Sequence, residues 1–142
     1  MQTEFKPFFD EHKDLYARLD YLLKELSKNK REINTEHLLD QVSALLIYVE
    51  ELLNNHFEEE EEMFETLEPV EKDSQELLAR ILNDHQEIRE KHQSLKQAYT
   101  NIVHCSTTEG DLDLQKNLLF PAYNLIATIN HHAQREDNFF QA

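Results

Sequence analysis

Six side chains with metal-binding chemistry recur along this chain at the spacing of an α-helix. They are His12, His56, Glu60, His85, His132 and Glu136. Glu60 follows His56 by four residues, and Glu136 follows His132 by the same interval, so each pair shares one helical face. Imidazole and carboxylate groups without a thiolate suit iron, manganese or zinc as ligands. The six residues therefore predict a metal site, provided that their helices face one another.

The four histidines continue apolar stripes, which predicts that their side chains point into a core. His12 shares its helical face with Leu15 and Leu19, and the other three histidines follow aliphatic residues at similar spacing. A buried carboxylate without a compensating partner is costly, and a pair of cations would compensate the two glutamates. The alternative interpretation is a set of polar core groups that satisfy one another.

The two halves of the chain resemble each other at these positions. Residues 8–15 align with residues 81–88, and residues 56–64 align with residues 132–140. Both alignments match histidine with histidine, and the second also matches the two glutamates. Plain core packing would conserve apolar residues across such a repeat, so the repeated histidines and glutamates favour a shared chemical role.

Helical periodicity provides four elements that could position these residues. The apolar spacing predicts helices over residues 7–26, 35–67, 73–103 and from 111 or 113 to 140. Thr35 and Asp73 are expected as N-caps, and Pro121 should kink or divide the last helix. A chain with one Gly and three Pro lacks the turn residues of a β-rich fold. Short connections, including a turn at 106–110, predict an all-α, antiparallel up-down-up-down four-helix bundle as one domain over residues 1–142.

Composition excludes several classes of partner. The formal net charge of −15 disfavours nucleic acid and anionic membrane surfaces. No window approaches the roughly 20 apolar residues of a membrane span, and the N-terminus carries no secretory signal pattern. A single cysteine, Cys105, cannot form an intramolecular disulfide and fits a reducing compartment. We therefore expect a cytoplasmic protein that binds neither nucleic acid nor membrane.

The arrangement resembles the hemerythrin-like family of four-helix bundles that hold a non-haem di-iron centre. The resemblance covers essentially the whole chain and depends on His12, on His56 with Glu60, on His85, and on His132 with an acid. It implies two iron ions (Fe2+/Fe3+) with an oxo or hydroxo bridge, with the four histidines as terminal ligands and Glu60 and Glu136 bridging. It also implies that the protein binds or senses dioxygen, nitric oxide or peroxide.

The chain departs from oxygen-carrying hemerythrins at two positions. Arg89 stands where a second histidine is found on the third helix, and either Glu136 or Asp137 could be the acid of the fourth helix. We prefer Glu136, because Asp137 then aligns with Glu61 in the internal repeat. The set of four histidines and two glutamates is similar to that of iron–sulfur repair proteins within the family. Iron donation or cluster repair under oxidative or nitrosative stress is therefore an alternative function, and a structural bundle with a degenerate metal site is another.

Several neighbouring residues receive simpler interpretations. We expect His92 to be a core or supporting residue, Tyr16 to line the pocket or serve structurally, and Arg89 to turn toward the acidic surface. Within the acidic run 58–62, Glu60 should point inward and the rest should face solvent, with Glu61 as an extra candidate ligand. No catalytic residue is assigned.

Overall fold

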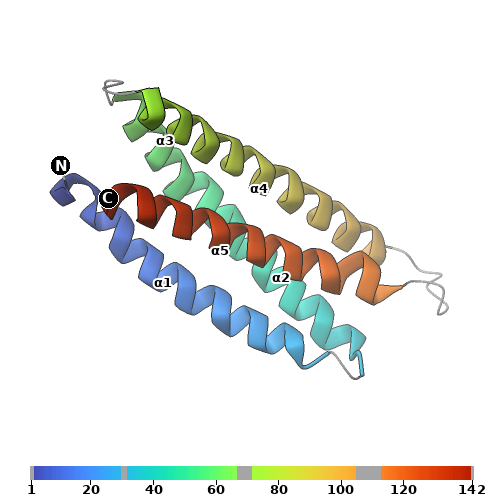
Figure 1. Ribbon diagram of the computed structural model, residues 1–142. Helices are drawn as coiled ribbons and strands as arrows, with labels where there is room; N and C mark the ends of the chain where they lie inside the picture. The colour runs from blue at the N-terminus through green and yellow to red at the C-terminus, as the bar shows by residue number, and fades with distance from the viewer. Residues whose placement is uncertain (1, 30–31, 67–71, 105–112, 142) are drawn as a thin grey trace.

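The fold is a bundle of four antiparallel helical rods. The computed structural model describes residues 2–29, 32–66, 72–104 and 113–141. It contains α1 (Gln2–Ser27), α2 (Thr35–Glu51), the π-helical segment η1 (Leu52–His56), α3 (Phe57–Thr66), α4 (Lys72–His104), the π-helical segment η2 (Gln115–Leu119) and α5 (Phe120–Gln141). Because α2, η1 and α3 follow one another without a gap, they form one rod, as do η2 and α5 (Figure 1). The predicted all-α four-helix bundle is confirmed.

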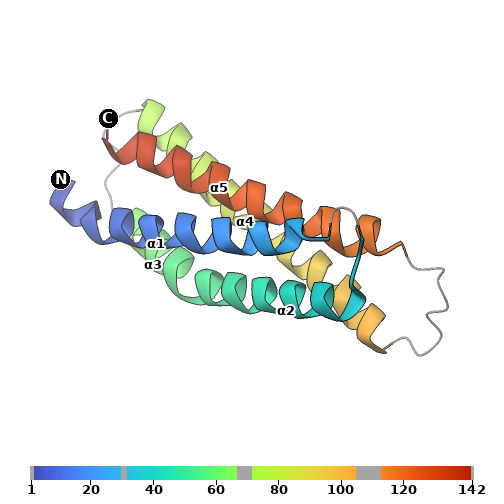
Figure 2. The same cartoon turned by 90° about the horizontal axis from the view of Figure 1, so that it is seen from below.

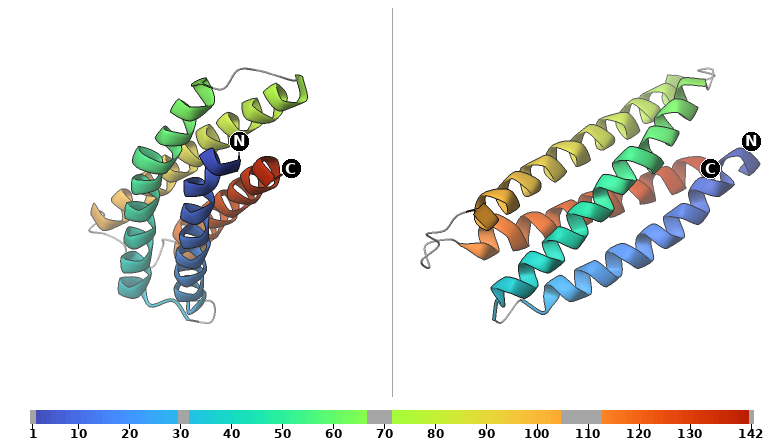
Figure 3. Two further views of the ribbon diagram at one scale, coloured as in Figure 1. Left: turned by 90° about the vertical axis from the view of Figure 1, so that its left-hand side faces the viewer. Right: turned by 180° about the vertical axis from the view of Figure 1, so that it is seen from behind.

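The rods are arranged as a ring in which each helix has two main neighbours. α1 packs against α2 and α5, and α4 packs against the same two helices from the opposite side (Figures 2 and 3). Both chain termini lie at one end of the bundle, where α3 also ends and α4 begins. The interior is filled mainly by leucine, isoleucine and valine, including Leu19, Leu45, Ile88 and Leu125, each almost completely buried. Val103, at the end of the predicted helix 73–103, is exposed.

One of the two π-helical segments lies near Pro121, where an irregularity was expected, and the other was not predicted. Pro121 was expected to kink or divide the last helix. The helix instead continues through Pro121, the second residue of α5, and changes its hydrogen-bond pattern in η2, which ends at Leu119. Because proline lacks a backbone N–H and its ring clashes with the preceding turn, a local π-helical pattern is one way to accommodate it. η1 ends at His56, so the π-helical turn sets the direction in which the His56 side chain points from the backbone.

The helix ends correct two of the predicted caps. Asn34, not Thr35, is the N-cap of α2, since its side chain accepts a hydrogen bond from the backbone N–H of His37 at 3.0 Å. Asp73 lies inside α4, which already begins at Lys72. Asp113 does precede the last rod, and its carboxylate accepts from the backbone N–H of Lys116 at 3.0 Å. The predicted turn at 106–110 and the alternative start at Asp111 lie outside the described residues.

A buried polar network joins α1 to α2 at the end of the bundle away from the termini. Gln41 donates to the backbone carbonyl of Glu25 at 2.7 Å and accepts from the side chain of Asn29 at 2.8 Å. Asn29 also donates to the backbone carbonyl of Leu26 at 3.1 Å. These bonds supplement the backbone N–H groups of Lys28 and Asn29, which reach the carbonyls of Glu25 and Leu26 at the C-terminal end of α1 at 3.3 and 3.0 Å.

The Gln41→Leu variant tests this network. Loss of the side-chain amide leaves one hydrogen of Asn29 without its acceptor and leaves the carbonyl of Glu25 with only the 3.3 Å bond from the backbone N–H of Lys28. This should lower the free energy of unfolding by about 1–3 kcal/mol. Urea denaturation followed by circular dichroism measures the change, with the exposed Gln93→Leu substitution as the control. Equal stability of the two variants would show that the network does not hold this end of the bundle together.

Candidate metal centre

All six predicted residues meet inside the bundle. His12 comes from α1, His56 ends η1, Glu60 lies on α3, His85 lies on α4, and His132 and Glu136 lie on α5. Their exposed fractions range from 0% to 6%, so water has almost no access to them. The region lies in the half of the bundle nearest both termini, on the opposite side of the core from the Gln41 network.

The six side chains form two overlapping groups of four ligands. One group contains His12, His56 and the two glutamates, and the other contains His85, His132 and the same two glutamates. Within each group the ligand atoms all lie within 4.8 Å of one another. Sharing of both carboxylates between two histidine pairs is the geometry expected of a bridged two-metal site.

Glu136 lies at the centre of these contacts. Its carboxylate is 3.3 Å from Nε2 of His12, 3.2 Å from Nε2 of His132 and 3.9 Å from Nε2 of His85. On the other side, Nε2 of His56 is 2.6 Å from the carboxylate of Glu60 and 3.1 Å from Nε2 of His12. Lone pairs from all four rods therefore converge on a small volume.

The donor set fits a cation better than it fits mutual hydrogen bonding. Within the described part of the chain, both carboxylate oxygens of Glu136 and Nε2 of His85 and His132 are buried and make no hydrogen bond. Buried polar atoms in native proteins nearly always have a partner, and an unpaired buried carboxylate is the most expensive kind. A cation would satisfy these atoms together, so the residues present match the predicted metal site.

Each histidine is held by a second carboxylate on the far side of its ring. Nδ1 of His12 is 2.6 Å from Asp137, Nδ1 of His85 is 3.1 Å from Glu61, and Nδ1 of His132 is 3.2 Å from Asp84. Nδ1 of His56 contacts Glu11 in the same way. Donation of Nδ1–H to a carboxylate leaves Nε2 as the lone-pair donor and fixes the ring, as it does in most histidine-ligated metal sites.

These supporting carboxylates follow the internal repeat. In the alignment of the two halves, Glu11 matches Asp84 and Glu61 matches Asp137. Each matched pair supports a matched pair of histidines, so the whole arrangement has approximate twofold symmetry. Sequence analysis assigned most of the acidic run to solvent and missed this role. The repeat itself contained the signal, because it matched these acids as well as the histidines.

The pKa of His85 is consistent with a ligand that stays neutral. Burial, together with the nearby positive charges of His132, Arg89 and His56, lowers it to about 2. Burial also lowers the pKa of His56, but hydrogen bonds to Glu60 and Glu11 and their negative charges outweigh burial and raise it above its usual value. The negative charges that favour a proton on the His56 ring would also favour a metal cation at its Nε2.

Phe57 closes one side of the site, and sequence analysis did not identify it. Its ring is fully buried and stacks on His85 with centroids 4.4 Å apart and an interplanar angle of 18°. The ring also meets His132 edge-on at 5.4 Å and lies 5.5 Å from His56. Its position between two predicted ligands, His56 and Glu60, was the available clue. Phe57 therefore excludes water and limits the movement of the histidine rings.

The remaining predictions for nearby residues have mixed outcomes. His92 is buried and donates to the backbone carbonyl of Leu46 at 3.1 Å, which confirms a core role. Arg89 and Glu61 are only partly exposed, at 34% and 29%, because their side chains form an ion pair beside His85. Arg89 does turn to an acid, as expected, but neither side chain points freely into solvent. Tyr16 donates to Asp137 at 2.7 Å and so supports the site indirectly. Cys105 lies outside the described residues.

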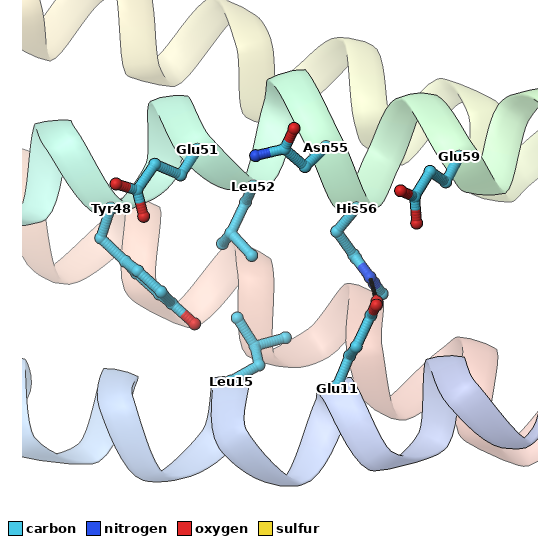
Figure 4. A pocket seen from close by; sticks show the side chains of 8 residues that line it. All are labelled: Glu11, Leu15, Tyr48, Glu51, Leu52, Asn55, His56 and Glu59. Atoms are coloured by element: carbon cyan, nitrogen blue, oxygen red, sulfur yellow. Dashed lines mark hydrogen bonds and ion pairs between the residues drawn. The ribbon is translucent and has the colours of Figure 1, made fainter.

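An open pocket of about 210 Å³ lies beside His56, between α1 and the rod of α2, η1 and α3. Figure 4 shows Glu11 and His56 pointing toward each other across this pocket, with Glu51 and Glu59 along its edge. Leu15, Tyr48, Leu52 and Asn55 complete the lining. The pocket brings solvent to the outer side of the His12 and His56 group.

Asp137→Ala tests whether the supporting carboxylates matter. The change removes the acceptor of both His12 Nδ1 and the Tyr16 hydroxyl, so the His12 ring loses its fixed tautomer and orientation. We expect metal affinity to fall about 10- to 100-fold while the number of ions bound at saturation stays the same. Competition with a chromogenic chelator measures this, with the exposed neighbour Asn138→Ala as control. An unchanged affinity would argue that Asp137 is a surface acid with no part in the site.

Comparison with known proteins agrees with this site. Residues 5–142 match the family model described as Hemerythrin HHE cation binding domain. No curated protein and no solved structure matched the chain. In addition, none of the helices among the described residues combines the length and apolar character needed to cross a membrane.

Proposed function

Because the chain belongs to the hemerythrin HHE cation-binding family, we propose that it holds two iron ions and binds or senses dioxygen, nitric oxide or peroxide. The observation that carries the proposal is the pair of four-ligand groups that share Glu60 and Glu136. In this proposal His12 and His56 are terminal ligands of one ion, and His85 and His132 are terminal ligands of the other. The two glutamates bridge both ions.

Iron is proposed because the donor set is imidazole and carboxylate without thiolate. Zinc accepts the same donors but has no redox chemistry, whereas iron supplies the redox change that reaction with a small oxidant requires. Manganese also accepts these donors, and metal analysis of the isolated protein distinguishes it from iron. Four protein ligands per ion, two of them shared, leave coordination positions for an external ligand. Asp137 and its three counterparts keep Nε2 of each histidine free for the metal, and Phe57 excludes bulk water.

The reaction of ferrous protein with small oxidants tests this function. Protein loaded anaerobically with ferrous iron should contain two irons per chain and change its near-ultraviolet absorption on exposure to dioxygen or nitric oxide. The doubly substituted His12→Ala, His85→Ala chain serves as the control, since it lacks one ligand from each group. If the protein binds two irons but its absorption responds to none of these molecules, the metal site is supported and the sensing function is contradicted.

Iron donation, including repair of iron–sulfur clusters, is the second candidate. This function is favoured by Arg89, which lies one helical turn after His85. Its side chain pairs with Glu61 and gives the metal site no ligand, where a histidine could have supplied one. An ion with few protein ligands is released more readily than one whose coordination is filled by the chain. Transfer of iron from the reduced protein to an apo iron–sulfur protein, without transfer from free ferrous iron at the same concentration, would favour donation over sensing.

A further inference from the structure

The two halves of the site share their ligands but differ in the charges that surround them. We infer that the two metal positions are unequal: the His12 and His56 position holds its cation more tightly, and the His85 and His132 position releases its cation first. The inference depends on the proposed two-metal site. It adds a difference in affinity between the two positions, which the approximate twofold symmetry of the ligands alone would not produce.

Two arginines neutralise the supporting carboxylates on the His85 and His132 side. Arg89 forms an ion pair with Glu61, which supports His85. Arg135 bonds both carboxylate oxygens of Asp84, at 3.0 and 2.8 Å, and Asp84 supports His132. Each supporting carboxylate on this side therefore has a guanidinium beside it.

The corresponding positions on the His12 and His56 side carry no positive charge. In the internal repeat Tyr16 takes the place of Arg89, and Glu59 takes the place of Arg135. Tyr16 gives Asp137 a neutral hydroxyl at 2.7 Å. Among the described residues, neither Asp137 nor Glu11 pairs with an arginine or lysine.

The surroundings of His56 increase this difference. Glu11, Glu51 and Glu59 line the pocket beside it (Figure 4), so three carboxylates lie on this side of the site. Arg18 is on the same face, but its guanidinium lies over the Tyr48 ring, 5.5 Å from the ring centroid, and pairs with none of the three within the described part of the chain. The field at this position is therefore the more negative of the two.

Both effects of the arginines weaken cation binding on their side. A guanidinium repels a bound cation directly. The side chains of Arg89 and Arg135 are 34% and 44% exposed, so solvent weakens this repulsion, but the buried ligands that they face preserve part of it. A carboxylate that shares its charge with arginine is also a weaker acceptor for Nδ1–H, so the imidazole that it supports is a weaker metal ligand. The matched carboxylates near His12 and His56 keep their full charge.

Anaerobic titration of the intact protein with ferrous iron measures the predicted inequality. We expect two binding steps whose affinities differ by about 10-fold or more, the range by which changes in outer-shell partners alter metal affinity. Arg135→Gln should strengthen the weaker step, and Glu59→Arg should weaken the tighter step. Arg80→Gln and Glu58→Arg are matched controls, because they make the same charge changes at exposed positions.

The direction of the Arg135→Gln effect separates a charge effect from a structural one. If Arg135 only positioned Asp84, its loss would weaken binding, and that result would overturn the inference. Two steps of equal affinity in the unaltered protein would also overturn it, while leaving the two-metal proposal intact. Binding of fewer than two ions would instead contradict the proposed function itself.

Discussion

Glu60→Gln is expected to abolish binding of both metal ions, although it only replaces one carboxylate oxygen with an amide NH2 group. Glu60 belongs to both four-ligand groups, so its loss removes a ligand from each. The amide has nearly the same shape but no charge, and it cannot bridge two cations as a carboxylate does. We expect metal affinity to fall by at least ~100-fold, since even outer partners of ligands account for 10–100-fold. Metal analysis after gel filtration measures the change.

Matched variants make this result specific. Glu62→Gln, at an exposed position in α3, should bind two ions like the unaltered chain. Glu136→Gln should behave like Glu60→Gln, whereas Asp137→Asn should still bind two ions at saturation. If Asp137→Asn lost the ions and Glu136→Gln kept them, Asp137 would be the bridging residue of α5. A Glu60→Gln chain that retains two ions would contradict the bridging arrangement.

Removal of metal is expected to lower the melting temperature of the protein by about 10 °C. A ligand that binds only the folded state at ~1,000 times its dissociation constant stabilises it by ~4 kcal/mol, and for a chain of this length each kcal/mol corresponds to a few degrees. The physical source is the pair of nearly unexposed carboxylates, which lose their compensating charge when the cations leave. Thermal unfolding with and without a strong chelator measures the shift.

The Glu60→Gln chain supplies the control for this experiment. Because it is not expected to bind metal, chelator should leave its melting temperature unchanged. It should also melt above the metal-free unaltered protein, since it buries one carboxylate fewer. If chelator has no effect on the unaltered protein, the six side chains do not hold cations in solution.

The convergence of the six candidate ligands could be predicted from sequence because its signals are local. The four-residue spacing of His132 and Glu136 fixes a shared helical face, and apolar neighbours fix which face is inward. The internal repeat then relates both halves without any knowledge of how the helices pack. The same reasoning predicted four helices and a disturbance near Pro121, which became the π-helical segment η2.

The supporting shell could not be predicted in the same way because it joins different helices. Glu61 contacts His85 and Arg89 across the α3–α4 interface, and that contact depends on how two rods are rotated and offset. In a run of five acids, periodicity distinguishes the inward Glu60, but it cannot tell which of the others reaches a neighbouring helix. The same limitation explains why Arg89 was assigned to the surface.

The helix caps failed for a different physical reason. Asn and Thr are both good N-cap residues, and they are adjacent at the start of α2. The backbone of Asn34 is extended, with φ −92° and ψ 108°, so the side chain of this residue reaches the N–H of His37. Sequence preferences place a helix start in this region but do not choose between neighbouring candidates.

The most direct test of the central claim is X-ray diffraction from crystals of the iron-loaded protein, with anomalous data collected at the iron absorption edge. We predict two anomalous peaks about 3.5–4 Å apart, both within bonding distance of Glu60 and Glu136. One peak should lie next to His12 and His56, and the other next to His85 and His132. A single peak, no peak, or glutamate side chains turned away from the bundle interior would contradict the account.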